Sequence, residues 1–155
     1  MGEQTLNKLK IFVYGTLKPG EANYKRCCAG SVVEAKRAIA FGQLFNLPLG
    51  YPAMTPGESP VQGFLLTFTD PKVLSILDEL EDYDPHRTPE ENEYDRQQVE
   101  IYDLGGESLG LAWVYLMTCE QVQHLGGVLM QSGWWSGSID TLRTLPKINH
   151  PNQQY

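Results

Sequence analysis

Five stretches rich in Val, Ile, Phe, Tyr and Leu constrain the fold of this chain more than any other feature. Clusters of Gly, Pro, Asp and Asn separate them, which is the pattern of β-strands joined by turns. The expected strands cover residues 9–14, about 32–46, 61–69, 94–104 and 108–117. The last two are joined through Gly105-Gly106-Glu107-Ser108, so we expect them to form an antiparallel hairpin. The chain is therefore predicted to be mostly β-structure.

One segment, which begins at Asp70-Pro71, breaks the β pattern. An Asp suits the N-cap of a helix and a Pro suits its first turn. Apolar side chains then recur at helical spacing at Val73, Leu74, Ile76, Leu77 and Leu80. A second helix is expected to start at Thr118, because the following residues have the form of a capping box, although Gly126-Gly127 interrupts that segment.

Length and charge exclude several classes of protein. With 155 residues, the chain fits one domain, which we place at 9–142 with a C-terminal tail at 143–155. The net charge of −7 leaves no basic surface for nucleic acid, and no apolar run has the length of a signal peptide or membrane helix. The three cysteines have the spacing of neither a disulfide framework nor a paired metal site, so a cytoplasmic location is expected.

The segment Tyr14-Gly15-Thr16-Leu17-Lys18-Pro19-Gly20 ends the apolar run 11–14 in a turn. A glycine in such a turn permits a backbone conformation that a Cβ would forbid, and successive N–H groups of the turn can converge on an anion. The turn is thus a candidate site for the carboxylate of a small molecule. The alternative is an ordinary connection between a strand and a loop, because Gly-Thr and Pro-Gly are common there.

Glu81, at the end of the first predicted helix, is the candidate catalytic acid. At helical spacing it lies roughly 70° from the centre of the apolar stripe, nearer than Asp78, Glu79 or Asp82. The negative end of the helix dipole and partial burial would both raise the pKa of this carboxyl, which suits a general base. The alternative is a boundary glutamate whose stem covers the core while its carboxylate reaches water.

Several motifs in a fixed order resemble the γ-glutamylcyclotransferase-like superfamily, in the AIG2-like branch that includes γ-glutamylamine cyclotransferases. They are Val13-Tyr14-Gly15-Thr16-Leu17-Lys18-Pro19-Gly20, Gly50-Tyr51-Pro52-Ala53, Leu77-Asp78-Glu79-Leu80-Glu81, Tyr94-Asp95-Arg96 with Val99 and Ile101, and Ser132-Gly133-Trp134. The resemblance covers residues 11 to about 135. It implies an α+β fold, a small and mostly antiparallel β-barrel, closed or nearly closed, with flanking helices.

The resemblance also implies a reaction. The α-amino group of a γ-glutamyl amine or peptide attacks its own γ-carbonyl, which releases 5-oxoproline and a free amine without a cofactor or metal. Glu81 would be the general acid/base, and residues 14–17 would line the cavity. The alternatives are a noncatalytic module of the same fold that binds a small metabolite, and an enzyme of this fold acting on another acyl substrate.

Three further residues are candidates for contact with the substrate. Tyr51 and Tyr94 offer either a hydroxyl or an aromatic wall, with simple core packing as the alternative for each. Arg96 would counter a substrate charge or, as is commoner, pair with the acidic surface. The acidic stretch 82–93 is a candidate lid that would favour cationic over anionic leaving amines. The oligomeric state cannot be read from the sequence.

Overall fold

The computed structural model describes residues 8–28 and 30–137, and the structural statements below refer to these residues. The predicted domain end at residue 142 and the predicted tail at 143–155 lie outside them. A seven-stranded mixed sheet forms the body of the protein. Its strands are β1 (Leu9–Val13), β2 (Val32–Asn46), β3 (Pro52–Pro56), β4 (Ser59–Phe68), β5 (Asp95–Tyr102), β6 (Ser108–Leu116) and β7 (Val128–Leu129).

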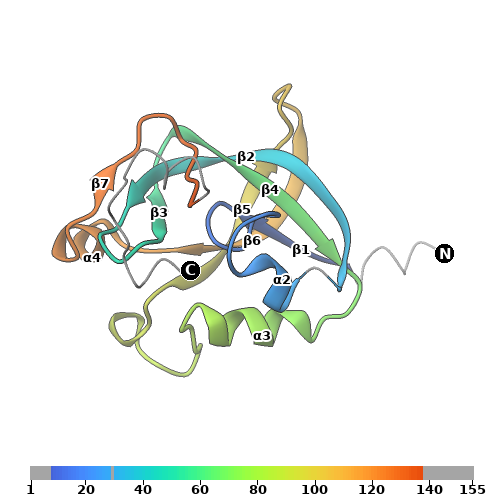
Figure 1. The fold of residues 1–155 in the computed structure, drawn as a ribbon, viewed down its shortest axis with the longest axis horizontal. Coiled ribbons are helices and arrows are strands. Elements are labelled where there is room, and N and C mark those ends of the chain that lie inside the picture. Colours follow the sequence, from blue (N-terminus) through green and yellow to red (C-terminus); the bar gives the residue numbers. More distant parts are fainter. Residues whose placement is uncertain (1–7, 29, 138–155) are drawn as a thin grey trace.

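The strand order is β3-β2-β4-β1-β6-β5, with β7 paired to β2. The pair β1 and β6 is parallel, whereas the other pairs are antiparallel, including the predicted hairpin of β5 and β6. β5 also meets β2 through the single pair Ile39 and Tyr102. The sheet is therefore mixed and strongly curved, and the expected small, mostly antiparallel β-barrel is not confirmed. Figure 1 shows β2 and β4 arching over β1, β5 and β6.

The apolar run of β1 is explained by burial on both faces of the sheet. β1 lies between β4 and β6, so it is a central strand. Ile11 and Val13 belong to one apolar cluster, and Phe12 and Tyr14 belong to another on the opposite side. A strand covered on both faces needs apolar side chains at successive positions, because neighbouring residues point to opposite faces. This strand leads directly into the turn that begins at Gly15.

The helix α3 (Val73–Leu80) covers one of these clusters, next to the short helix α2 (Tyr24–Cys27) (Figure 1). It begins later than the sequence predicts, because the Oδ1 atom of Asp70 accepts a hydrogen bond from the Lys72 N–H at 3.0 Å and holds a separate turn. Val73 and Leu77 are buried, whereas Ile76 is 50% exposed. The assignment of Ile76 to the buried stripe is therefore wrong, since only one narrow face of this two-turn helix meets the core.

The second predicted helix is confirmed as α4 (Cys119–His124). The Thr118 hydroxyl accepts the Gln121 N–H at 3.1 Å, as expected for an N-cap. The sequence did not predict α2, β3 or β7, which have two to five residues each. β3 carries a proline at both ends and lies at the edge of the sheet, where a missing N–H is tolerated.

Candidate active site

A cavity of about 270 Å³ lies between the end of β1, the start of β3, the end of α3 and the start of β5. This volume suits a small metabolite. The lining residues are Phe12, Val13, Tyr14, Gly15, Thr16, Leu17, Asn23, Tyr51, Pro52, Leu80, Glu81, Glu93, Tyr94 and Tyr115. Seven of the eight residues that the sequence singled out for catalysis or substrate contact are among them, all but Arg96, although their roles remain predictions.

The turn after β1 forms one wall of the cavity. Hydrogen bonds from the Lys18 N–H to the Gly15 carbonyl, at 3.0 Å, and from the Asn23 N–H to the Thr16 carbonyl, at 2.8 Å, fix its shape. The Asn23 side chain also donates to the Thr16 hydroxyl at 3.0 Å. Within the described part of the chain, the N–H groups of Gly15, Thr16 and Leu17 have no hydrogen-bond partner. These groups are therefore available to an anionic or carbonyl oxygen in the cavity.

Gly15 is required in this turn by a close approach, and not by its dihedral angle. Of the two glycines of the motif, only Gly20 has a positive φ, at 91°. A Cβ added to Gly15 would lie 2.6 Å from Cγ and 2.9 Å from Cδ of Pro52, the first residue of β3. The expectation that Gly15 permits a special backbone conformation is therefore wrong. Its missing side chain lets the turn pack against β3 and so sets the width of the cavity.

Glu81 is held at the end of α3 by the hydrogen bonds that terminate the helix. The Tyr83 N–H donates to the Asp78 carbonyl at 2.9 Å, and the Asp82 N–H donates to the Glu79 carbonyl at 3.2 Å. Asp82 has the positive φ of 57° that this Schellman arrangement requires of the residue after the cap. The chain thus reverses just after Glu81, whose backbone is fixed by its own N–H bond to the Leu77 carbonyl at 2.9 Å.

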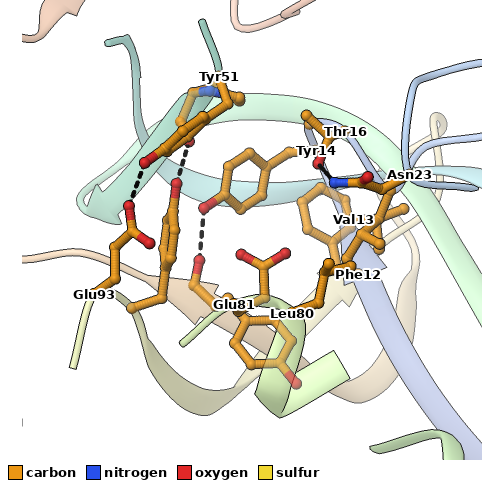
Figure 2. Close-up of a pocket in the computed structure, with 14 residues that line it drawn as sticks. Phe12, Val13, Tyr14, Thr16, Asn23, Tyr51, Leu80, Glu81 and Glu93 are labelled. Atoms are coloured by element: carbon orange, nitrogen blue, oxygen red, sulfur yellow. Dashed lines mark hydrogen bonds between the residues drawn. The ribbon is translucent and has the colours of Figure 1, made fainter. Parts of the chain in front are cut away.

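The Glu81 carboxylate points into the cavity, below the ring of Tyr14 (Figure 2). It makes no hydrogen bond to another described residue. Burial raises the pKa of this carboxyl from 4.5 to about 8, and the nearby charge of Glu93 contributes a smaller rise. A carboxyl with this pKa can both accept and return a proton near neutral pH.

The three tyrosine hydroxyls of the predicted site donate their protons to protein acceptors. Tyr14 donates to the Tyr115 carbonyl at 2.6 Å, and Tyr94 donates to the Pro52 carbonyl at 2.7 Å. Tyr51 donates to a carboxylate oxygen of Glu93. Burial raises the pKa of both Tyr14 and Tyr94 well above its usual value, so these hydroxyls stay protonated. The geometry therefore favours them as walls of the cavity over donors to a ligand.

The predicted alternatives for Arg96 are resolved by its contacts with α3. Its guanidinium donates to Oδ2 of Asp78 at 3.0 Å, and Tyr115 donates to the other oxygen of the same carboxylate at 2.7 Å. The guanidinium also lies 4.5 Å from the ring centre of Trp113. Arg96 does not line the cavity. It joins α3 to β5 and β6, and so it supports the helix that carries Glu81.

Replacing Asp78 by Ala is expected to lower the free energy of unfolding by about 2–4 kcal/mol. The side chains of Asp78 and Arg96 are only 16% and 15% exposed, and removing one partner leaves a charge with little compensation. Urea denaturation should detect this loss. The control is Glu79→Ala, an exposed acid on the same helix, for which a change within about 0.5 kcal/mol is expected. Equal effects of the two substitutions would contradict the bracing role of Asp78.

Sequence reasoning missed three polar residues of the cavity, namely Asn23, Glu93 and Tyr115. Glu93 stands at the end of the acidic stretch 82–93, which the sequence marks as a candidate lid without distinguishing any one of its acids. Asn23 lies seven residues beyond Thr16, in a helical turn that no pattern predicted. Tyr115 is one of several apolar positions of β6, and only the strand register shows that it lies opposite Arg96.

Three further features of the described residues bear on function. Among them, no group of three His, Cys, Asp or Glu side chains is placed to hold a metal ion. No helix within this part of the chain is long and apolar enough to span a membrane. Cys119 is an exposed free thiol, whereas Cys28 is buried and disulfide-bonded.

Comparison with known proteins gives a consistent result. The family model described as "Gamma-glutamyl cyclotransferase, AIG2-like" matches residues 11–137. A protein of Niallia circulans named gamma-L-glutamyl-butirosin B gamma-glutamyl cyclotransferase is 35% identical over 106 residues, which are 68% of this chain and 65% of that protein. The chain thus spans slightly under two thirds of the length of that relative.

The matches to two further relatives cover a larger share of those proteins. A Drosophila melanogaster protein named as a gamma-glutamylcyclotransferase is 31% identical over 128 residues, or 76% of this chain and 74% of that protein. The crystal structure of a mouse AIG2-like protein has a TM-score of 0.65 and 25% identity, and the match covers 93% of this chain and 99% of that one. By its sequence, its fold and the extent of these matches, the chain belongs to the AIG2-like γ-glutamyl cyclotransferase family.

Proposed function

We propose that this protein is a γ-glutamyl cyclotransferase that converts a γ-glutamyl amine or γ-glutamyl peptide into 5-oxoproline and a free amine. The observation that carries the proposal is the position of Glu81. Its carboxylate, with a pKa raised to about 8, shares one small cavity with a turn whose N–H groups are unused by the rest of the described chain. Family membership supports cyclotransferase activity in general, and the role of Glu81 is inferred from this geometry.

The reaction needs a proton carrier. The α-ammonium of the substrate, with a pKa of about 8, must lose a proton before its nitrogen can attack the γ-carbonyl carbon. Glu81 accepts this proton as the new C–N bond forms. It then donates the proton to the γ-nitrogen as the original amide bond breaks, because an amine leaves poorly unless it is protonated. The carboxylate is restored. The ring nitrogen gives up its second proton as the lactam forms, and the released amine takes up a proton to become an ammonium, so the overall reaction neither gains nor loses a proton.

The turn after β1 supplies orientation. N–H groups of Gly15, Thr16 and Leu17 bind the substrate carboxylate or the carbonyl oxygen, and so hold the glutamyl unit curled with its amine beside its γ-carbonyl. Positioning of this kind contributes about 7 kcal/mol or more in favourable cases, against roughly 3–4 kcal/mol for one oxyanion donor. Because the reaction is intramolecular, we expect orientation to contribute most of the rate enhancement.

The test is to incubate the purified protein with a panel of γ-glutamyl amides and to detect 5-oxoproline by mass spectrometry. Formation of 5-oxoproline together with the free amine is the expected result. Binding of the amides without turnover would instead identify a noncatalytic module of the same fold. Release of glutamate instead of 5-oxoproline would identify an acyl-transfer enzyme that uses water.

The pH dependence of kcat/KM is expected to be bell-shaped, with both midpoints near pH 8. Below the pKa of about 8, Glu81 is protonated and cannot act as a base. Above the α-ammonium pKa of about 8, the site holds no proton for the leaving nitrogen. Steady-state kinetics between pH 3.5 and 10 measure the profile. An acidic midpoint near 4.5 would show that the group that must lose its proton is an ordinary carboxyl.

A further inference from the structure

Glu93 brings a second carboxylate into the cavity, and the proposed chemistry does not use it. Its backbone N–H donates to the Asp82 carbonyl at 3.1 Å, which closes the stretch 82–93 at its base. One oxygen of its side chain accepts the hydroxyl proton of Tyr51. The carboxylate is thus held from two sides, by the loop and by the segment before β3. The other acids of this stretch do not line the cavity.

The cavity has a strong bias of charge. Among the described residues, its lining includes the two carboxylates of Glu81 and Glu93 and no Lys or Arg side chain. Because both carboxylates line one cavity, the negative charge of Glu93 adds to the effect of burial in raising the pKa of Glu81. A ligand that carries positive charge relieves this repulsion, whereas an anionic ligand increases it. The γ-glutamyl unit itself offers one cation, its α-ammonium, which the mechanism assigns to Glu81.

The arrangement of the side chains separates two ends of the cavity (Figure 2). Thr16 and Asn23 lie on one side of the Glu81 carboxylate, and Tyr51 and Glu93 lie on the other. If the turn at 15–17 holds the glutamyl carboxylate, the γ-amide bond is directed toward Tyr51 and Glu93. The Tyr51 ring beside the Glu93 carboxylate offers an aromatic face and a negative charge, a pairing that suits an ammonium group.

We infer that Glu93, positioned by Tyr51, selects γ-glutamyl amides whose leaving amine carries a second positive charge, such as monoacylated diamines. This inference rests on the proposed cyclotransferase reaction and narrows its substrate class. The sequence associates a preference for cationic amines with the acidic stretch 82–93 as a whole, and the inference attributes it to Glu93 alone. The exposed acids of residues 82–93 act at a distance through solvent, where salt screens them, while Glu93 meets the leaving group directly.

Three matched substrates test the inference. They are the γ-glutamyl amides of 1,4-diaminobutane, of butylamine and of 4-aminobutanoate, which are cationic, neutral and anionic in the leaving group. The wild-type protein is expected to prefer the cationic amide over the neutral one by about tenfold in kcat/KM, with the anionic amide poorest. All three substrates use Glu81 as the base. The protonation state of Glu81 at a given pH therefore affects their rates equally and does not change the ratios of kcat/KM.

The variant Glu93→Gln is expected to reduce the preference for the cationic over the neutral amide by about tenfold, with both amides measured at the pH optimum of the variant. It should also move the acidic limb of the pH profile to lower pH, since a negative neighbour of Glu81 is removed. The matched control is Glu90→Gln, an exposed acid of the same stretch that lies outside the cavity, for which no change is expected.

The possible results distinguish the selecting role of Glu93 from the cyclotransferase activity itself. If the wild-type protein forms 5-oxoproline but does not prefer the cationic amide, or if Glu93→Gln keeps the full preference, Glu93 is not the selecting group and the cyclotransferase assignment stands. If no amide gives 5-oxoproline, both are overturned. The wild-type preference alone decides the matter should Glu93→Gln fail to fold.

Discussion

Glu81→Gln is expected to lower turnover by at least about a thousandfold while making the protein more stable at pH 8. Gln keeps the size of the side chain but can neither accept the proton of the α-ammonium nor return it to the leaving nitrogen. General acid/base catalysis contributes about 10²–10⁴-fold, and here a single group performs both transfers. Binding of 5-oxoproline should be largely retained. Residual 5-oxoproline formation, measured by mass spectrometry, gives the size of the loss.

The gain in stability follows from the raised pKa of Glu81. Below about pH 4.3, the carboxyl is protonated in both the folded and the unfolded protein, so it does not lower the free energy of unfolding. Between that pH and about 8, the unfolded state loses the proton and the folded state keeps it, so stability falls as pH rises. The carboxylate borders an open cavity, where water screens its charge. We therefore expect the ionised Glu81 to lower the free energy of unfolding at pH 8 by about 1–3 kcal/mol, which is less than the full pKa shift would give.

Urea denaturation at pH 4 and pH 8 checks this expectation. The variant should match the wild-type protein at pH 4, where protonated Glu and Gln are alike, and exceed it at pH 8. Glu79→Gln, on the exposed side of the same helix, serves as the control for both stability and turnover. A variant with near-normal turnover would remove Glu81 from the mechanism, whatever its stability.

Gly15→Ala is expected to reduce kcat/KM by about 10- to 100-fold and stability by about 1–3 kcal/mol. The new Cβ would lie 2.6 Å from Cγ of Pro52, and a proline ring cannot turn aside, so the turn must move away from β3. A displacement of about 1 Å in a group that orients the substrate has a large effect on rate. The substitution leaves Glu81 in place, so the pH midpoints should not change.

Gly30→Ala is the matched control for Gly15→Ala. Gly30 is exposed, has no positive φ, and no heavy atom lies within 4 Å of an added Cβ. The same substitution there should leave kcat/KM and stability unchanged or slightly improve stability. If Gly15→Ala retains wild-type kcat/KM, the close packing of the turn on β3 does not set the geometry of catalysis.

The sequence predicted the elements whose signals are local. The run of β1, the hairpin of β5 and β6, and the helices near Asp70 and Thr118 each depend on side chains close together in the chain. Helical spacing placed Glu81 nearest the apolar stripe among the acids of its helix, but it left open whether the carboxylate turns inward or reaches water. The reason for Gly15 could not be predicted, because its partner Pro52 lies 37 residues away, on an edge strand that no pattern revealed.

The position of Glu93 in the cavity could not be predicted from the sequence. Eight acids between Asp78 and Glu93 look alike in composition, and charge runs are usually solvated. Only the reversal of the chain at Asp82, a non-glycine residue with positive φ, and the hydrogen bond from the Glu93 N–H to the Asp82 carbonyl bring this one acid back to the cavity. Both features depend on tertiary packing, which overrides local preference.

The most direct measurement is an NMR titration of the glutamate side-chain carboxyl carbons, with the Glu81 signal assigned by its loss in Glu81→Gln. A midpoint near pH 8 that coincides with the acidic midpoint of kcat/KM is the expected result. A Glu81 midpoint near 4.5 would contradict the central claim, because a carboxyl with that affinity is an ordinary solvated acid and not the proton carrier of the reaction.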